Sequence, residues 1–337
     1  MKRVHNDVGN FMRAISLKAA SLVAVAFSLV GAHAEAQPYP ARPISLLVAI
    51  GPGSAQDVVT RVLSTKVSHA IGQPIVITNN GGAGGAIALA QTARAKPDGY
   101  SLICNGTPML TMLPQTRSVP YKLEDFEPIM HFGAGQYGLA VRADSGWKTL
   151  KEFVDFAKMN PGKVSVGTLA VGTFLHTAMY VIQKKEGLDW IHVPYAGGGM
   201  GTNALLGGHI SAESGAAGLF QLARAGKVRL LASYGERRSK SMPDVPTLRE
   251  LGYDFKLANF IMLAAPKGTP SAIVRQLDAA YHKAMDDPEF VQVMEKYETD
   301  LSYRGPDELR AYLEEMYVAY GRIAKELKIP GAPEAAK

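Results

Sequence analysis

Apolar and polar positions alternate along the chain in two patterns, short apolar runs and longer segments with helical spacing. Residues 44–50 form an apolar run that only Ser45 interrupts, as expected of a strand covered on both faces. From Asp57 to Ile71, apolar residues recur with the spacing of one helix face, and Gly72 follows at a position suited to a helix end. This alternation predicts an α/β protein with largely parallel strands.

An order of strand, small-residue loop and helix occurs in both halves of the chain. Further strands are predicted at 75–78, 101–104, 164–167 and 190–193, and helices at 86–95 and 173–185. The repeated order predicts two lobes of related architecture. Two amphipathic helices follow at 271–285 and 306–326, the first with Thr269 or Ser271 as its expected N-cap.

The first 36 residues resemble a secretory signal peptide. Four basic residues precede or flank a short apolar stretch at 19–30, and Ala34-Glu35-Ala36 is a small-x-small cleavage pattern. The stretch is shorter than the roughly 20 residues that span a bilayer. We therefore expect cleavage after Ala36 and export to a Gram-negative periplasm, with an uncleaved anchor as the alternative.

Charge and cysteine content narrow the classes of function. Loss of residues 1–36 removes four basic and two acidic side chains, which lowers the formal net charge from +6 to +4. So small and scattered an excess gives no reason to expect a nucleic-acid partner. Cys104 is the one cysteine and lies in an apolar run, so we expect a buried thiol and no intrachain disulfide.

Motifs for catalysis and for cofactor binding do not occur in the sequence. Histidines and cysteines never fall at metal-ligand spacing, and no serine lies in a Gly-x-Ser-x-Gly elbow. The glycine loop at 82–87 has Ile87 where a dinucleotide-binding loop needs its last glycine. We therefore expect a protein that is not an enzyme and binds neither metal nor cofactor.

Five loops at predicted strand ends remain as candidates for ligand binding. Free N–H groups and the helix dipole make such strand-to-helix junctions suitable for anions. The candidates are 51–58, 79–87, 105–109, 168–176 and 195–203, and none of them contains Lys or Arg. Their glycines have an alternative explanation, since tight turns need positive φ whatever the function.

Four side chains in or near these loops have expected roles, and two of them have an alternative. Asp57 is expected to cap or open a helix, or else to meet a ligand donor. Tyr195 lines a pocket or is a half-buried structural residue, and His176 is expected to make a structural hydrogen bond. Glu213, within the small-residue run 211–217, is expected to face the cleft.

The same loops resemble the substrate-binding receptors of tripartite tricarboxylate transporters, the Bug-type proteins. The similarity starts at Tyr39-Pro40-Ala41-Arg42-Pro43-Ile44 and covers essentially the whole chain after residue 36. Matching segments, in order, are 51–57 (Gly-Pro-Gly-Ser-Ala-Gln-Asp), 79–85, Pro97-Asp98-Gly99-Tyr100, Val193-Pro194-Tyr195, 205–208, 225–229, 243–247 and 265–270.

This resemblance implies a two-lobed periplasmic binding protein of type II-like fold, with a ligand cleft between the lobes. It implies a small carboxylate as ligand, whether an aromatic acid or a di- or tricarboxylate, and membrane transporter subunits as partners. We expect a monomer in which residues 37–138 and 257–337 form lobe one and 139–256 form lobe two, with hinge crossings near Gly138 and Lys256. The alternatives are a sensor that docks on a signalling receptor and a periplasmic hydrolase or lyase.

The residues expected to contact the ligand come from both lobes. They are Gly53, Ser54, Ala55, Gln56, Asp57, Thr107, Thr168, Gly172, Thr173, Phe174, Tyr195 and Glu213. The chain departs from the family pattern at Ser54, Ala55, Gln56, Ala170 and Phe174, so the ligand of a relative cannot be transferred to it. Phe174 either stacks on a bulky or aromatic carboxylate or turns into the core of its lobe.

Overall fold

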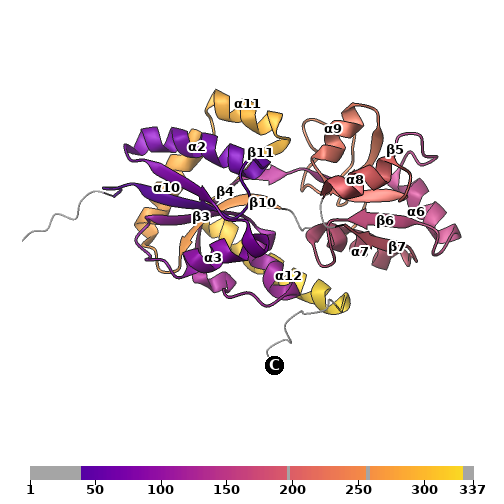
Figure 1. The fold of residues 1–337 in the computed structure, drawn as a ribbon, viewed down its shortest axis with the longest axis horizontal. Helices are drawn as coiled ribbons and strands as arrows, with labels where there is room; N and C mark the ends of the chain where they lie inside the picture. Colours follow the sequence, from indigo (N-terminus) through magenta and orange to yellow (C-terminus); the bar gives the residue numbers. More distant parts are fainter. Residues whose placement is uncertain (1–38, 196–197, 256–258, 329–337) are drawn as a thin grey trace, which may run out of the picture. The chain divides into compact units, whose positions relative to one another are not determined.

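A computed structural model describes residues 39–195, 198–255 and 259–328. Within them, strands form one six-stranded and one five-stranded sheet (Figure 1). The predicted signal peptide, and the hinge crossing at Lys256, lie outside the described residues. Among those described, no helix has both the length and the apolar composition needed to cross a membrane.

The first sheet, with its helices, is called lobe one. Its strands, in sheet order β11-β4-β10-β3-β1-β2, are Thr299–Arg304, Phe126–Gly135, Phe260–Pro266, Ser101–Gly106, Ile44–Val48 and Ile75–Asn79. Its helices are α2 (Ala55–Ile71), α3 (Ala86–Ala93), α4 (Pro108–Thr111), α5 (Leu113–Thr116), α10 (Ser271–Ala284), α11 (Pro288–Lys296) and α12 (Pro306–Glu326), with short 3₁₀ turns at Gly82–Gly85 and Leu123–Asp125.

The second sheet, with its helices, is called lobe two. Its strands, in sheet order β7-β6-β8-β5-β9, are Ile191–Pro194, Ser165–Thr168, Ala212–Ala216, Tyr137–Arg142 and Val228–Ser233. Its helices are α6 (Leu150–Met159), α7 (Phe174–Glu186), α8 (Gly198–Leu206) and α9 (Gly218–Arg224). The chain passes from the first sheet to the second at Gln136, between β4 and β5, close to the crossing expected near Gly138.

Both sheets are mixed, so the prediction of largely parallel strands was wrong. In lobe one only β2-β1-β3 is parallel, and β10, β4 and β11 run antiparallel to their neighbours. In lobe two β7-β6-β8 is parallel and β5 is antiparallel to both β8 and β9. The antiparallel strands β10, β4, β5 and β9 are mostly buried, as are the parallel strands β1 and β3, so burial alone does not reveal direction.

The two lobes have the same arrangement of their parallel strands and are related in architecture, as the repeated sequence order predicted. Each has a central parallel strand, β1 or β6, that leads through a loop to a long helix, α2 or α7, and next to it two further strand-to-helix units. Because the three strands are parallel, their carboxyl ends meet at one edge of each sheet. The candidate loops follow these ends.

Helix ends conform to the sequence in most places. Gly72 ends α2 in the left-handed conformation at φ 69°, which glycine adopts without a steric cost. The expected cap of α10 was wrong: Pro270 holds the N-cap position, and the Thr269 hydroxyl donates instead to the carbonyl of Pro266 at 2.7 Å.

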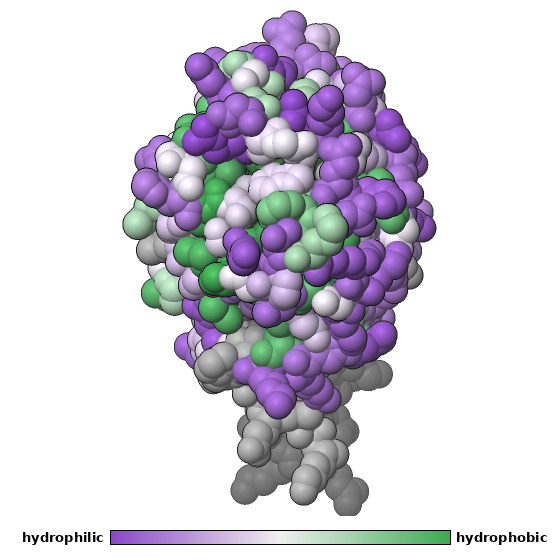
Figure 2. Space-filling model, turned by 90° about the vertical axis from the view of Figure 1, so that its right-hand side faces the viewer, coloured by the Kyte–Doolittle hydropathy of each residue, from purple (hydrophilic) through white to green (hydrophobic). Residues whose placement is uncertain are grey.

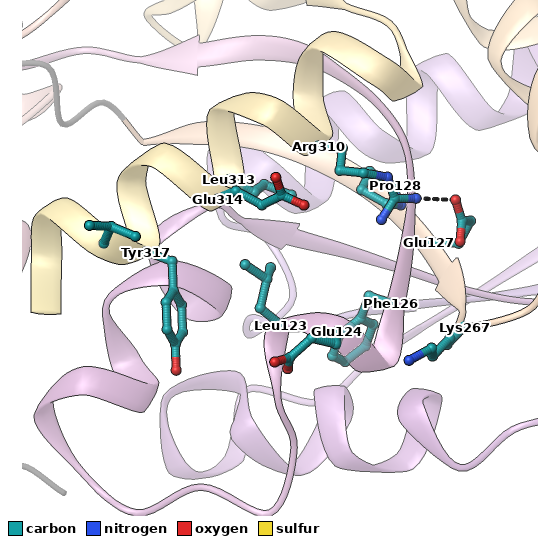
Figure 3. Close-up of a pocket in the computed structure, with 11 residues that line it drawn as sticks. Leu123, Glu124, Phe126, Glu127, Pro128, Lys267, Arg310, Leu313, Glu314 and Tyr317 are labelled. Atoms are coloured by element: carbon teal, nitrogen blue, oxygen red, sulfur yellow. Dashed lines mark hydrogen bonds and ion pairs between the residues drawn. The ribbon is translucent and has the colours of Figure 1, made fainter. Parts of the chain in front are cut away.

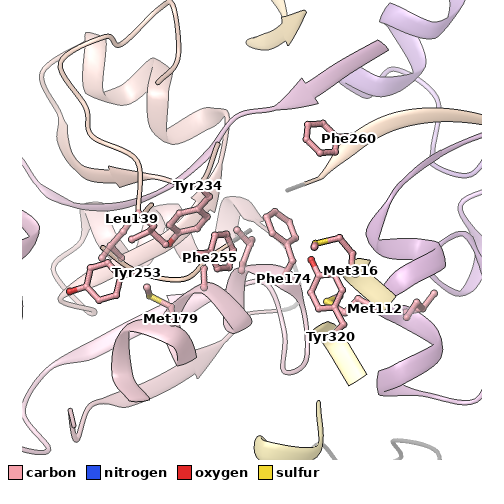
Figure 4. Close-up of a cluster of buried hydrophobic side chains, with 14 of the residues drawn as sticks. Met112, Leu139, Phe174, Met179, Tyr234, Tyr253, Phe255, Phe260, Met316 and Tyr320 are labelled. Atoms are coloured by element: carbon pink, nitrogen blue, oxygen red, sulfur yellow. The ribbon is translucent and has the colours of Figure 1, made fainter. Parts of the chain in front are cut away.

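Aromatic and aliphatic side chains fill the space between sheets and helices. The larger cluster includes Phe174, Tyr253 and Phe255 from lobe two together with Met316 and Tyr320 from α12 (Figure 4). On the face that Figure 2 shows, polar side chains cover most of the surface and apolar ones lie among them.

Candidate functional site

The loop before α2 is shaped by a short set of hydrogen bonds. Ser54 is the N-cap, and its Oγ accepts from the Asp57 N–H at 3.2 Å. Gly53 has φ 80°, a conformation that disfavours any other residue, and its N–H donates to Asp57 Oδ2 at 2.9 Å. The loop is thus held by the side chain of the third helical residue.

Asp57 is buried and has both carboxylate oxygens occupied within its own lobe. Its Oδ1 accepts from Arg61 Nε at 2.9 Å and from Asn79 Nδ2 at 2.8 Å. Burial would raise the pKa of Asp57, but the hydrogen bonds from Asn79 and Gly53 and the charge of Arg61 hold that pKa below its ordinary value. Asp57 is therefore a first-turn carboxylate, and Ser54 is the cap.

Two other predicted contacts in lobe one point towards the interior. The Gln56 side chain donates to the Cys104 carbonyl at 3.4 Å, and the buried Thr107 hydroxyl accepts from the Phe260 N–H at 3.2 Å. Cys104 is a buried free thiol, as predicted. Burial raises the pKa of Cys104 to about 12, so it carries no charge near neutral pH.

The loop before α7 repeats the arrangement found before α2. Thr173 is the N-cap, and its Oγ1 accepts from the His176 N–H at 3.4 Å and donates to the Ala170 carbonyl at 3.0 Å. Gly172 has φ 78°, and its N–H donates to His176 Nδ1 at 3.2 Å. The structural hydrogen bond expected of His176 is confirmed.

The tip of this second loop exposes backbone donors. The N–H groups of Leu169, Ala170 and Val171 have no acceptor among the described residues, and all three residues are solvent-exposed. The first two N–H groups of α7 also lie outside the helical hydrogen-bond pattern, as at any helix start. An anion at this position would meet N–H donors and the positive end of a helix dipole.

Phe174 turns into the protein interior rather than outward. Its side chain is 8% exposed, and its ring meets Tyr137 edge-to-face with 4.5 Å between centroids. In Figure 4 it lies among other buried apolar side chains. Of the two roles that the sequence allowed, the structure places Phe174 in the core.

Glu213 lies under α8 in a space that two glycines leave open. Its Oε1 accepts from Thr202 Oγ1 at 3.1 Å and would lie within 3.1 Å of a Cβ added at Gly201 or Gly215. Glu213 is 4% exposed, and its Oε2 has no partner among the described residues. Burial raises the pKa of Glu213 to about 7, against the hydrogen bond from Thr202.

Tyr195 is half-buried, and its ring packs beside Gly167 and Gly201 within the smaller apolar cluster of lobe two. Its N–H donates to the Thr168 carbonyl at 2.8 Å. The structure brings Tyr195, Thr168 and the Glu213 strand together at one edge of the second sheet, since Gly167 pairs with Glu213.

Three residues that the sequence did not single out belong to this region. Tyr137 accepts from Asn259 Nδ2 at 2.7 Å, and Asn259 lies against Gly106 at the end of β3. His192 lies beside Thr168, with 2.6 Å between Nε2 and Oγ1. No local pattern marks these residues, because their partners lie far away in the sequence.

A separate cavity of about 340 Å³ lies in lobe one, lined mainly by the start of β4 and by α12 (Figure 3). An ion pair of Arg310 and Glu127 flanks it. Phe126 in its wall pairs with Pro266, at the end of the sheet opposite to the carboxyl ends of β1 and β3. This cavity is therefore distinct from the candidate loops.

Comparisons with known proteins find similar sequences and similar structures. Residues 59–329 match the family described as "Tripartite tricarboxylate transporter family receptor". The chain is 35% identical to the "UPF0065 protein in gbd 5'region" of Cupriavidus necator (93% of this chain, 96% of that protein) and 30% identical to the protein BugT of Bordetella pertussis (90% and 94%).

Solved structures of solute-binding proteins are also similar to this chain. A TctC solute-binding protein from Polaromonas superposes with a TM-score of 0.78 at 30% identity, over 86% of this chain and 99% of that one. The MatC protein of Rhodopseudomonas palustris, solved with bound malate, superposes with a TM-score of 0.68 at 25% identity (85% and 100%). The expected two-lobed α/β receptor fold and the expected class, a solute receptor rather than an enzyme, are confirmed.

Proposed function

Because this chain belongs to the family of tripartite tricarboxylate transporter receptors, we propose that it captures a small carboxylate in the periplasm and delivers it to a membrane transporter of that type. The observation that supports this best is the paired arrangement before α2 and α7. In each lobe a helix N-terminus is directed towards the carboxyl edge of the sheet by the same three features. These are a glycine with positive φ, a hydroxyl N-cap and a hydrogen-bond acceptor on the third helical residue. Two such N-termini suit one anionic group.

The composition of the loops supports a ligand with a single carboxylate. None of the five loops contains Lys or Arg, and the one carboxylate among them, Asp57, is already paired with Arg61. If the N-termini of α2 and α7 together hold one carboxylate, a second one would find neither a further helix of that kind nor a cation in these loops. Burying it unpaired would cost several kcal/mol.

The same loops carry exposed apolar side chains, which favour an apolar body on the ligand. Leu169 and Val171 are 39% and 48% exposed, Met200 in the first turns of α8 is 57% exposed, and Ile87 in α3 is 52% exposed. Phe174, which the sequence offered for this role, is buried. We propose that these four side chains contact an aliphatic or aromatic monocarboxylate.

Export and hinge closure belong to the same proposal. Residues 1–36 act as a cleaved signal peptide, and residues 37–138 with 257–337 move against 139–256 about the two strand crossings. Of the twelve residues named from the sequence, Asp57, Gln56, Thr107 and Phe174 hold the loops from within the lobes, and the other eight remain the proposed ligand contacts.

A thermal-shift screen of the chain from residue 37 tests the ligand class. The panel pairs hexanoate with adipate and benzoate with phthalate, and adds malate and citrate. A ligand at 100 times its Kd adds about 2.7 kcal/mol to the free energy of unfolding. We expect larger shifts for hexanoate and benzoate than for their dicarboxylate partners.

Other outcomes separate the parts of the proposal. Thermal shifts with malate or citrate alone would still support a carboxylate receptor. They would contradict an apolar monocarboxylate as its ligand. No shift with any carboxylate would contradict carboxylate capture. Recovery of a chemically altered ligand, in proportion to time and protein, would contradict a receptor altogether.

A further inference from the structure

Two histidines lie face to face beneath the loop 168–173 of lobe two. His176 belongs to the first turn of α7 and His192 to β7, the strand beside β6. Their ring centroids are 4.0 Å apart and their planes differ by 8°. The pair therefore connects α7, the helix after the loop, to β7. β7 is the neighbour of β6, the strand that precedes the loop.

Each ring is bonded to one end of the loop. His192 Nε2 lies 2.6 Å from the Thr168 hydroxyl, and His176 Nδ1 accepts from the Gly172 N–H at 3.2 Å. Because Nδ1 accepts, the neutral His176 ring carries its proton on Nε2. The stacked pair therefore spans the loop from its first residue to its last glycine.

The loop between these two ends needs such support. Ala170 has φ 130°, in a region that residues with a side chain rarely adopt. Its carbonyl lies 3.0 Å from the Thr173 hydroxyl and 3.5 Å from the Thr168 hydroxyl, so the loop's own acceptor is used internally. The contacts at the two ends of the loop are therefore what can hold this unusual backbone in place.

Lobe one offers an independent parallel. Asp57 holds the same place in α2 that His176 holds in α7, and accepts from Gly53 as His176 does from Gly172. Asn79, at the end of the neighbouring strand β2, supports Asp57 as His192 on β7 supports His176. The same construction, built from different residue types, indicates a role that both lobes need.

We propose that the stacked His176–His192 pair is a positioning device that fixes the loop 168–173 for ligand binding, and that this loop is released when the pair is protonated. The inference rests on the proposed function. Neither histidine need touch the ligand, since each acts through the loop residue to which it is bonded.

Burial keeps the pair neutral at ordinary pH. Burial lowers the pKa of His176 to about 4, with a further contribution from His192, and burial also lowers the pKa of His192. β6, β7, the loop itself and the first two turns of α7 carry no other charged side chain. β8, which pairs with β6, carries the titratable Glu213, which accepts from Thr202 of α8. A protonated His176 cannot accept from Gly172, and two charged stacked rings repel each other.

Two variants of His176 test whether its hydrogen-bond acceptor or its aromatic ring holds the loop. His176→Phe keeps an aromatic ring but removes the acceptor, whereas the side-chain oxygen of His176→Asn can stand where Nδ1 stands. With the better monocarboxylate of hexanoate and benzoate as the probe at pH 7.5, we expect about fivefold to tenfold weaker binding for His176→Phe, one hydrogen bond's worth. We expect a change of less than about twofold for His176→Asn. His69→Phe, at an exposed histidine in the last turn of α2, should bind like the wild type.

A second measurement needs no ligand. In ¹⁵N–¹H spectra of the wild type, the Gly172 amide should shift as the pH falls towards 4, and in His176→Asn it should not. Equal affinity of His176→Phe and wild type, equal weakening in His176→Asn, or a pH-independent Gly172 amide would each overturn the inference. Absence of binding by the wild type to every carboxylate would instead overturn the proposed function, and the spectra would still decide whether the pair holds the loop.

Discussion

Burial sets the charge of three side chains around the proposed site. Asp57 stays ionised because Asn79, Gly53 and Arg61 compensate its burial, while His176 is kept neutral by a lowered pKa. The pKa of Glu213 is raised, since one hydrogen bond from Thr202 does not offset the effect of its burial. At neutral pH Asp57 is therefore ionised and paired, His176 is neutral, and Glu213 is close to the midpoint of its titration.

The raised pKa of Glu213 predicts a pH-dependent stability. Its folded-state pKa of about 7 lies above the ordinary value of 4.5. The stabilisation that this shift provides is complete below pH 4.5 and is lost as the pH rises through 7, up to about 3 kcal/mol in total. Glu213→Gln should be more stable than the wild type at pH 8 and close to it at pH 4.5, as measured by urea unfolding at both values.

Glu250 provides the control for that experiment. This exposed carboxylate accepts from the Thr247 N–H and pairs with Arg238, and these contacts lower its pKa. Its contribution to stability is present at pH 8 and lost as the pH falls, so Glu250→Gln should be destabilised most at pH 8. If both variants keep the wild-type pH dependence, the assigned charge of Glu213 is wrong.

Among the helices and loops, the hydroxyl cap of α7 has two roles that can be separated. Thr173 caps the helix and also ties the Ala170 carbonyl, whereas Thr149 caps α6 by accepting from the Glu152 N–H at 3.2 Å and lies outside the loops. Thr173→Ala and Thr149→Ala should each lose about 1 kcal/mol of stability. In calorimetry only Thr173→Ala should lose affinity, by about 0.5–1.5 kcal/mol. Equal affinity of the two variants would contradict a role for the loop in binding.

Helices were the most predictable elements. The apolar spacing from Asp57 to Ile71 and the glycine after it indicate α2 closely, and 306–326 matches α12. The antiparallel strands escaped prediction because direction depends on which strand lies alongside, and β10 returns to β3 from more than 150 residues away. The same distance effect hid His192 and Asn259, whose partners belong to other elements.

The sequence indicated the candidate loops, but it did not indicate the roles of their side chains. The glycines and caps at 53–54 and 172–173 follow from turn and helix chemistry. Whether Phe174 turned outward depended on Tyr137, which the sequence places 37 positions earlier and the fold places against its ring.

For the whole molecule, a positive net charge coexists with loops that contain no cation. Arg142, on β5, is paired with Asp144 and lies outside the loops. Arg142→Ala should therefore change the affinity for any carboxylate of the panel little, within about 0.5 kcal/mol, as expected of a surface ion pair. A large loss at Arg142 with none at Thr173 would indicate a guanidinium clamp and contradict anion binding by N–H groups.

Export makes a second prediction for the whole chain. Protein recovered from the periplasm should begin at Gln37 when its N-terminus is sequenced, because Ala34-Glu35-Ala36 provides the cleavage pattern. Retention of Met1 in a membrane fraction would support an uncleaved anchor instead.

The burial of Cys104 has a practical consequence. A thiol with a pKa of about 12 and no exposed surface does not react with maleimide dyes, so the native chain should remain unlabelled. A cysteine introduced at the exposed Val171 would then be the one reactive position. A dye attached there, on the loop that the histidine pair holds, would turn the receptor into a fluorescent sensor and report loop movement in real time.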